Sequence, residues 1–314
     1  MRYNHIKSLI PNYQKEATST MPSILLIPIL LFVDSLHFIF ARLLHPHSPP
    51  SVSVVFVLTV ATLEVGGYGF LTKQINWKEI KNNLWLFVAL GLLISASTTI
   101  NYEAVDFIDP GIASVIAQTG TVWAVLFGLL WLREELNPIQ IFGGVLAVGG
   151  IFLVNYQAGN YVQIGTLLVL ISSALYALHA ALTKKFSEAI NLTNFFFARL
   201  AFSTISIVLF SVFTGSLALP QASAWPYILL AGTIDVTISR TLYYIALRRL
   251  KLTVHTILLT LSPVIAILLS AALFNSALSP RQVIGGVVVL AGVLIVAVWR
   301  TRAPTTAKTQ AEFE

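Results

Sequence analysis

A few charged and aromatic side chains interrupt long apolar stretches of this sequence. Asp34 and His37 lie three residues apart, so they share one face of a helix. Asp235, Ser239 and Tyr243 are spaced by four and form a second such face. A charge at the centre of a bilayer costs about 2.5–3.5 kcal/mol, so side chains of this kind face protein or water. Carboxylates and imidazoles there can hold a polar solute or carry a proton.

An internal repeat links these residues to others. The chain matches itself without a gap at one constant offset, which aligns Tyr102 with Tyr244, Pro138 with Pro280, and Gly143-Gly144 with Gly285-Gly286. The same offset aligns Asp34 and His37 with Tyr176 and His179, further along the chain. It aligns Ser239 and Tyr243, from the face of Asp235, with Ser97 and Asn101 earlier in the chain.

The remaining candidates come from the neighbouring apolar segments. Gln118 and Trp123 lie in the fourth segment, and Arg240 lies beside Ser239 in the eighth. Arg199 and Arg240 either extend to the nearer membrane surface or reach the interior, where a guanidinium would bind a carboxylate or phosphate. Glu64 is expected to be a partner within the scaffold, and the acidic residues of one loop, Glu103, Asp106 and Asp109, to be solvated.

The elements that must position these residues are long apolar helices. The sequence has 314 residues, 56% of them hydrophobic and 10% charged, and its mean hydropathy is +0.82. So few charges exclude a soluble domain of this size. A crossing helix needs roughly 20 residues, and ten such segments are predicted at about 22–44, 50–72, 83–103, 110–132, 138–156, 163–184, 193–214, 225–247, 252–274 and 280–299.

The basic residues predict the orientation of these segments. With the N-terminus inside, the inner loops and ends hold nearly all of the Lys and Arg, whereas the outer ends hold only Arg42 and Arg281. This bias places both termini in the cytoplasm. Each repeat holds five segments, an odd number, so the second repeat crosses in the opposite sense to the first. The predicted fold is an all-α, multi-pass membrane protein of ten helices in two inverted five-helix repeats.

The domain boundaries follow from the repeat. We expect a cytoplasmic tail at 1–21, the first five-helix repeat at 22–156, the second at 163–300 and a disordered cytoplasmic tail at 301–314. The segment 1–21 is polar and does not form a signal peptide. The expected location is the cell membrane.

Caps and prolines mark two helices as scaffold. The fifth and tenth segments begin with Asn137-Pro138 and Ser279-Pro280, each a polar cap followed by proline at the first helical position. Glycines follow in both, and small residues allow close helix packing in lipid. Pro263 is expected inside the ninth helix, where it would weaken the helix or kink it.

These segments resemble the drug/metabolite transporter superfamily, EamA type, over nearly the whole chain. The resemblance is clearest in Tyr102-Glu-Ala-Val-Asp, Gly111-Ile-Ala-Ser-Val and Trp131-Leu-Arg-Glu-Glu-Leu-Asn-Pro-Ile-Gln-Ile-Phe-Gly-Gly, and in the copy at Leu278-Ser-Pro-Arg-Gln-Val-Ile-Gly-Gly. Glu134, Pro263 and Arg199 match residues that the family carries. Ser276 and Val57 depart from its pattern, and Asp34-Ser35 replaces its early tryptophan-glycine.

The resemblance implies a transporter whose central cavity is lined by helices one, three, four, six, eight and nine. These are the helices that carry the candidate residues. The expected ligand is a small polar or zwitterionic, amino-acid-like metabolite, and Asp34 and Asp235 are the candidates for coupling to protons. The resemblance does not identify the substrate.

Several functions are excluded or left open. The sequence has no zinc-protease, aspartyl or serine-hydrolase motif and no phosphate-binding loop, so we predict neither an enzyme nor an ATP-driven pump. No cofactor, metal or nucleic-acid partner is expected, and cysteine is absent. Export by alternating access is the first hypothesis. An importer, and a pore or lipid-translocating protein of the same architecture, are the alternatives.

Overall fold

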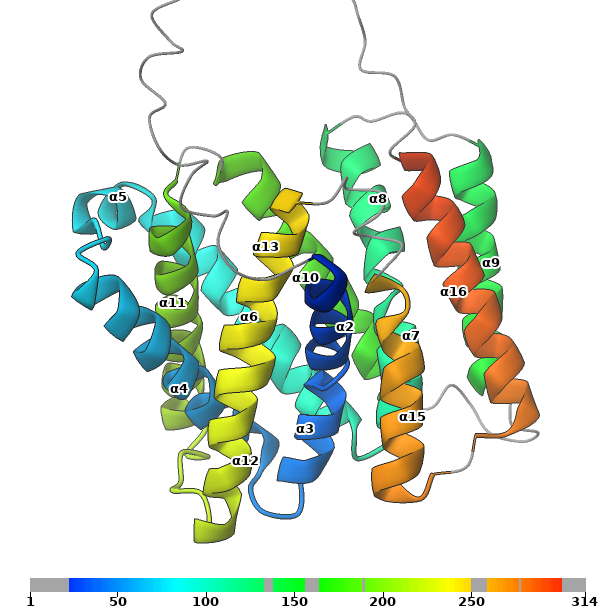
Figure 1. Cartoon of the computed structure of the whole chain (residues 1–314), viewed down its shortest axis with the longest axis horizontal. Coiled ribbons are helices and arrows are strands. Elements are labelled where there is room, and N and C mark those ends of the chain that lie inside the picture. Colours follow the sequence, from blue (N-terminus) through cyan, green and yellow to red (C-terminus); the bar gives the residue numbers. More distant parts are fainter. Residues whose placement is uncertain are drawn as a thin grey trace, which may run out of the picture.

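The structure is a computed structural model that describes residues 23–132, 138–155, 164–187, 190–249, 259–276 and 278–300. Within these ranges every regular element is helical, and the helices stand side by side in one bundle (Figure 1). Several predicted features lie outside the described residues. They are the tails at 1–21 and 301–314, the turn that contains Glu134 and Asn137, and the part of the ninth segment before residue 259.

Helices lie at each of the ten predicted positions. In chain order these are α2 (Ser23–Asp34) with α3 (His37–Leu44), α4 (Pro50–Leu71), α6 (Leu84–Ala104), α7 (Pro110–Ala117) with α8 (Gly120–Leu132), α9 (Pro138–Asn155), α10 (Ile164–Phe186), α11 (Leu192–Phe213), α12 (Trp225–Leu230) with η2 (Ala231–Ile238) and α13 (Ser239–Arg249), α15 (Ser262–Phe274), and α16 (Pro280–Arg300). The short helices α5 (Trp77–Asn82) and η1 (Ala222–Ala224) lie in connections.

Five of the described helices are long and apolar enough to cross a membrane by length and composition. They span Leu25–Leu44, Pro50–Leu71, Leu84–Ala104, Ile164–Thr183 and Leu192–Phe213. Three shorter apolar helices accompany them, at Pro138–Val154, Ser262–Phe274 and Pro280–Val296. Large apolar side chains, such as Leu71 and Phe213, are strongly exposed on the outside of the bundle, as expected of a surface that faces lipid.

The equivalent helices α9 and α16 pack tightly and run antiparallel. A Cβ added to Gly143 would lie 2.8 Å from the carbonyl oxygen of Gly292, and one added to Gly150 would lie 2.9 Å from that of Gly285. Successive residues along α9 therefore meet residues of decreasing number on α16, as in an antiparallel pair. Gly285 and Gly292 are also the repeat equivalents of Gly143 and Gly150, so the contact is two-fold symmetric. The predicted scaffold role of these glycines is therefore seen as close backbone packing.

The predicted helix starts agree with the structure where they are described. The Ser279 hydroxyl accepts from the Gln282 N–H at 3.2 Å, and the Gln282 side chain accepts from the Ser279 N–H at 2.9 Å. This reciprocal pair is a capping box, with Pro280 at the first helical position. Pro263, in contrast, does not lie in the interior of a helix but in a first turn. It is the second residue of α15, where its missing N–H breaks no helical bond.

Three of the ten apolar segments, the first, fourth and ninth, are broken within their length, which the sequence analysis did not predict. At each break a hydroxyl folds back onto the carbonyl three residues earlier: Ser35 to Phe32 at 2.6 Å, Thr119 to Ile116 at 2.7 Å, and Ser262 to Leu259 at 2.9 Å. Such bonds satisfy carbonyls that the helix no longer uses, which an apolar surrounding requires. The breaks in the fourth and ninth segments lie at equivalent positions, whereas α10 runs unbroken where the first segment bends.

The eighth segment contains eight residues of π-helix, η2, between two α-helical parts. Its equivalent in the first repeat, α6, is regular. Thr233 of η2 donates to Glu64 Oε1 of α4 at 2.5 Å, and Gly232 lies so close to α4 that a Cβ would meet Val60 at 2.7 Å. Glu64 is therefore a partner within the scaffold, as expected. The wide turns hold Asp235, and π-helical segments in α-helices often occur at functional sites.

The turns joining α3 to α4, α11 to α12 and α15 to α16 lie at one end of the bundle, drawn at the bottom of Figure 1. We call this the lower end, and the end that carries α5 the upper end. At the lower end α7 packs on α15 so closely that a Cβ on Gly111 would lie 2.7 Å from the Cα of Ile267. Asp109 caps α7 through Oδ1, at 2.8 Å from the Gly111 N–H, and accepts from Ser270 of α15 through Oδ2 at 2.6 Å.

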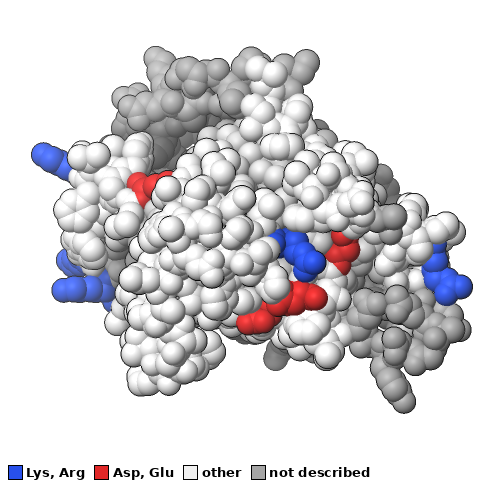
Figure 2. Space-filling model, turned by 90° about the horizontal axis from the view of Figure 1, so that it is seen from below, with Lys and Arg blue, Asp and Glu red and all other residues white. Residues whose placement is uncertain are grey.

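The loop carboxylates at the lower end are more engaged than the sequence suggested. Besides the two bonds of Asp109, Asp106 pairs with His45 at 2.7 Å, and Arg42 donates to the Val105 carbonyl at 2.5 Å. Figure 2 looks onto this end, where acidic and basic side chains gather near the middle of a largely uncharged face. A cavity of about 300 Å³ there is lined in part by Arg42, Asp106 and Asp109. The expectation of simple solvation was wrong for Asp109, whereas Asp106 is exposed and also pairs with His45.

Candidate functional site

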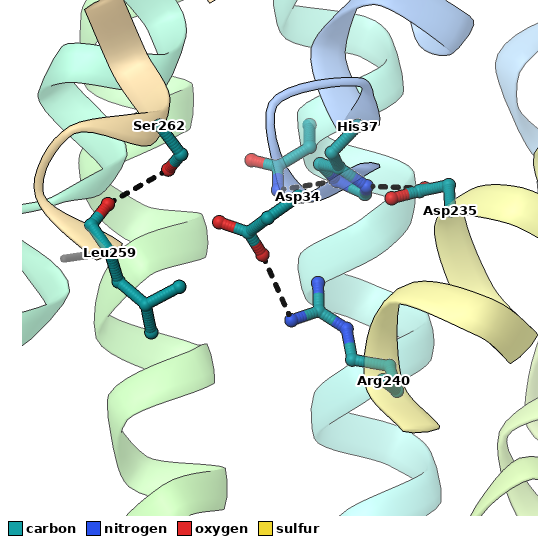
Figure 3. Close-up of polar contacts among 7 residues, drawn as sticks. Asp34, His37, Asp235, Arg240, Leu259 and Ser262 are labelled. Carbon is teal, nitrogen blue, oxygen red and sulfur yellow. Dashed lines mark hydrogen bonds and ion pairs between the residues drawn. The ribbon is translucent and has the colours of Figure 1, made fainter. Parts of the chain in front are cut away.

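Charged residues from the first and eighth segments meet in the interior of the bundle. Asp34, the last residue of α2, lies 3.6 Å from Arg240 of α13, and His37, the first residue of α3, lies 2.9 Å from Asp235 of η2 (Figure 3). Asn101 of α6 lies 3.2 Å from the other side of the His37 ring. We call these five residues the central polar cluster. All are partly or fully buried, and Asp235 is only 2% exposed.

The helix break separates the roles of Asp34 and His37. The two residues were expected to act together on one helix face, but the chain turns at Ser35 and Leu36 between them. As a result Asp34 directs its carboxylate between Arg240 and the start of α15, whereas His37 faces Asp235 (Figure 3). The break therefore gives each carboxylate its own basic partner.

The contacts of His37 define its neutral tautomer. The Asn101 amide nitrogen donates to Nε2, so Nε2 must be an acceptor, and Nδ1 then carries the hydrogen that is donated to Asp235 Oδ2. If His37 gained a proton, Nε2–H would need an acceptor. Asn101 Oδ1 is buried without a partner among the described residues, and turning the amide about would present it to the ring.

Several buried polar atoms near the cluster lack a partner in the described part of the protein. They include Asp235 Oδ1, Asn101 Oδ1, the Tyr102 hydroxyl and Ser239 Oγ. The Tyr102 ring meets the edge of the His37 ring at a centroid distance of 5.9 Å. A buried polar atom without a hydrogen bond costs about 1–3 kcal/mol, so such a concentration of them is typical of a site completed by a ligand.

The predicted face on the sixth segment also approaches the cluster. Arg240 lies over the Tyr176 ring at 5.9 Å, and the rings of Tyr176 and His179 are 5.5 Å apart. Tyr243, one turn beyond Arg240 on α13, interacts with its guanidinium electrostatically. The structure therefore brings together eight of the predicted residues: Asp34, His37, Asn101, Tyr176, His179, Asp235, Arg240 and Tyr243.

The other predicted residues have different surroundings. Ser97 is 3% exposed and is bonded to Ser172 of α10, hydroxyl to hydroxyl at 2.9 Å, so it joins two helices. Gln118 and Trp123 flank the break between α7 and α8 and are half-buried. Ser239 lies fully buried at the start of α13, four residues after Asp235.

The sequence analysis did not place Tyr102 or Arg199 in the site. The signal for Tyr102 was its alignment with Tyr244 in the repeat, which alone did not distinguish packing from function. Arg199 was expected either at the membrane surface or in the interior, and the structure buries it to 4% exposure. Among the described residues, no three His, Asp or Glu side chains gather closely enough to hold a metal ion.

Comparisons with known proteins agree with this architecture. Over 89 residues the chain is 34% identical to the uncharacterized transporter sll1319 of Synechocystis sp., covering 26% of this chain and 27% of that protein. Over 215 residues it is 27% identical to the uncharacterized transporter YojE of Bacillus subtilis, covering 67% of this chain and 70% of that protein. One crystal structure shares the fold at 18% identity, with a TM-score of 0.63 over 88% of this chain and 98% of the other.

The family comparison covers both repeats. The model of the EamA-like transporter family matches residues 21–156 and again residues 163–298. The starts of the two matches, at 21 and 163, are separated by the same offset that relates Tyr102 to Tyr244 in the internal repeat. This chain, with its two equivalent helical repeats and its buried polar cluster, belongs to the EamA-like transporter family.

Proposed function

We propose that this membrane transporter exports a small zwitterionic, amino-acid-like metabolite by alternating access. In this proposal the ten helical segments all cross the membrane, both termini lie in the cytoplasm and the lower end faces outward. The two-fold antiparallel contact of α9 and α16 supports an inverted pair of repeats. The excess of Lys and Arg in the loops of the upper end supports the orientation.

The central polar cluster is the observation that carries the proposal. It holds two carboxylates, one guanidinium and several buried acceptors and donors that lack partners among the described residues. The ion pair of Asp34 and Arg240 is loose, at 3.6 Å, so a ligand can insert between its members. An ammonium group would then lie against Asp34 and Asp235, and the acidic group of the ligand on the side of the cluster where Arg240 lies, each matched in charge.

The pairing of Asp235 with His37 supports protons as the coupling ion. Protonation of Asp235 removes the charge of the acceptor and weakens the bond that the imidazole donates to it, whereas protonation of His37 strengthens that bond. A substrate ammonium that displaces this proton would exchange one positive charge for another at the same carboxylate, which is how a proton gradient drives export. Asp34 offers a second carboxylate for the same exchange.

The closed lower end supports a state that opens toward the upper end. The packing of Gly111 against Ile267 and the bond between Asp109 and Ser270 both join α7 to α15 there. Alternating access requires this contact to separate when the upper end closes. The contact is therefore the place at which to test the proposal.

The absence of native cysteine makes the test direct. Ile267→Cys reports on the lower end, and Leu259→Cys, at a residue that packs against the cluster that contains Leu26 and Leu30 of α2, reports on the interior below the upper end. A membrane-impermeant maleimide is applied to each face of proteoliposomes while L-amino acids and related zwitterions are added one at a time. We expect a transported compound to change the two labelling rates in opposite directions. Simultaneous labelling of both sites from both faces would favour the pore.

The direction of transport is measured in the same vesicles. A carrier that exchanges substrate for protons releases a preloaded zwitterion when the opposite compartment is made acidic. Uptake of the zwitterion driven by the same proton gradient would favour the importer instead. Compounds without an ammonium group are expected to be poor substrates. If they move as fast as their zwitterionic counterparts, the assignment of substrate class is wrong.

A further inference from the structure

Arg199 is a buried cation for which the described residues supply no counter-ion. Its side chain, on α11, is 4% exposed, and its Nε has no hydrogen-bond partner among them. The ring of Phe196 lies one turn earlier, with the guanidinium carbon 5.1 Å from the ring centroid. Burying an unpaired ion costs several kcal/mol, more than one contact with an aromatic ring returns. Exposure of 4% also excludes the alternative in which Arg199 extends to the membrane surface.

A second basic side chain faces the same region. His179 of α10 is also 4% exposed, and its Nδ1 has no partner among the described residues. Its Nε2 lies 3.5 Å from the Thr183 hydroxyl, a long and weak contact. Leu178 and Leu182 of α10 and Ala198 of α11 belong to one hydrophobic cluster, so the parts of α10 and α11 that carry His179 and Arg199 lie in the same region. His179 of α10, Arg199 of α11 and Arg240 of α13 therefore lie in one region. The Asp34 carboxylate is within ion-pair distance of Arg240, and no described carboxylate is within that distance of Arg199.

The position along the helices places these groups above the central polar cluster. Arg199 is the eighth residue of α11, and His179 is seven residues before the end of α10. At 1.5 Å per residue both lie about 10 Å from the upper ends of their helices. A ligand that enters from the upper end passes this region before or while it contacts Asp34 and Asp235.

We propose that Arg199 and His179 form an anion-binding subsite that takes the carboxylate of the transported molecule, or another oxyanion of similar size. The inference rests on the proposed function, and it divides the ligand between two poles. The acidic group lies at Arg199 and His179, and the ammonium group lies toward Asp34 and Asp235. A guanidinium binds a carboxylate through two parallel N–H bonds, and the His179 Nδ1 supplies a further contact.

Melting of the purified full chain in nanodiscs tests the subsite without requiring transport. Sodium acetate and sodium phosphate are compared with sodium chloride at equal ionic strength in neutral phosphatidylcholine. We expect an oxyanion at ten times its dissociation constant to raise the melting temperature of the wild type by about 2 °C or more. Arg199→Gln should lose this rise, Arg199→Lys should keep part of it, and Arg281→Gln, an exposed arginine at the other end, should match the wild type. An equal rise in Arg199→Gln would overturn the subsite.

Lipid headgroups carry the same oxyanion chemistry, so a second arm separates the sources. Nanodiscs with and without phosphatidylglycerol are compared for wild type and Arg199→Gln. If Arg199-dependent stabilisation appears only with the anionic lipid, and never with acetate or phosphate, the subsite holds a headgroup and the proposal is wrong.

Transport kinetics then distinguish this inference from the proposed function. For a transported amino acid, Arg199→Gln should raise KM about 10-fold or more for the acid and leave KM for its amide unchanged, since one good charged contact contributes ~1.5 kcal/mol or more. An anion effect on melting without transport of any zwitterion would contradict the proposed function alone. Zwitterion transport that depends on Asp34 but shows the same KM in Arg199→Gln would contradict the subsite alone.

Discussion

Thr62 of α4 and Thr204 of α11 share a hydrogen bond, with 2.9 Å between their hydroxyl oxygens, and they occupy the same position in the two repeats. A residue can touch its own equivalent only beside the axis that relates the repeats. The contact between α9 and α16, in which Ala147 and Val289 are also equivalents, marks a second point on that axis. Contacts on the axis are shared by both repeats, so an exchange of conformations between the repeats leaves them in place.

Cross-links on and off this axis should therefore behave differently. Thr62→Cys with Thr204→Cys, once oxidised, is expected to leave transport near the wild-type rate, because the replaced oxygens are already neighbours and need not separate. Asp109→Cys with Ser270→Cys is expected to stop transport until a reductant is added, because it joins α7 to α15. Gel mobility shows whether each cross-link has formed, and flux in proteoliposomes measures the transport rates. An axial cross-link that stops transport reversibly would show that α4 and α11 must part.

Asp34→Asn should abolish coupled transport and leave the amount of folded protein unchanged. The amide keeps the shape of the side chain but removes the charge that faces Arg240 at 3.6 Å. Flux across an imposed pH gradient is measured in proteoliposomes, with size-exclusion profiles as the check on folding. Asp106→Asn at the lower end is the matched control and should lose less than half of the flux. Full transport by Asp34→Asn excludes both a binding and a coupling role.

The helix contact between the repeats should tolerate no side chain at Gly292. A Cβ there would lie 2.5 Å from the Gly143 carbonyl oxygen and 2.5 Å from the Ala147 nitrogen, so Gly292→Val should cost roughly 1–3 kcal/mol of stability. Gly149→Ala is the control on the same pair of helices, because no atom lies within 4 Å of its added Cβ. Melting in a mild detergent compares the two, and equal melting temperatures would mean that α9 and α16 pack less closely than described.

Thr233→Val should loosen the π-helical segment that holds Asp235. The change removes the hydroxyl that donates to Glu64 and leaves a partly buried carboxylate without this partner, at a cost of about 1–3 kcal/mol. We expect a lower melting temperature together with slower flux. Glu64→Gln keeps an acceptor for Thr233 and should be milder. Thr241→Val, at an exposed residue of α13 whose hydroxyl bonds to the Thr237 carbonyl, is the control and should be near neutral.

The sequence predicted the fold because its strongest signals are long-range and redundant. The ten apolar stretches and the gapless internal repeat each involve many residues, so a few departures such as Ser276 do not obscure them. The caps of α16 were also legible, since Ser279 and Gln282 act within four residues. Neither the repeated apolar pattern nor a local cap requires knowledge of which residues meet in the folded protein.

The details of the site depend on contacts that the sequence does not show. The π-helix of the eighth segment is held by Glu64, which is 169 residues from its partner Thr233. Ser97 and Asn101 have the same helical spacing as a binding face, yet one bonds to Ser172 and the other to His37. At the breaks the hydroxyls of Ser35 and Thr119 bond to carbonyls of the preceding turn, but Thr62 and Thr99 make similar bonds inside unbroken helices. Burial of Arg199 depends on the helices that pack against α11, which its position in the sequence alone could not decide.

The two carboxylate oxygens of Asp109 bond to different helices at the lower end. Oδ1 accepts from the first N–H groups of α7, and Oδ2 accepts from Ser270 of α15. Of the bonds that Asp109 makes, only the one to Ser270 would break in the proposed opening, so α7 would keep its N-terminal cap while its packing on α15 is lost. Water that enters the opening can replace the Ser270 hydroxyl at Oδ2. In the proposed mechanism this exchange lowers the polar cost of opening the lower end, so that ligand and proton binding at the distant cluster could bias which end is open.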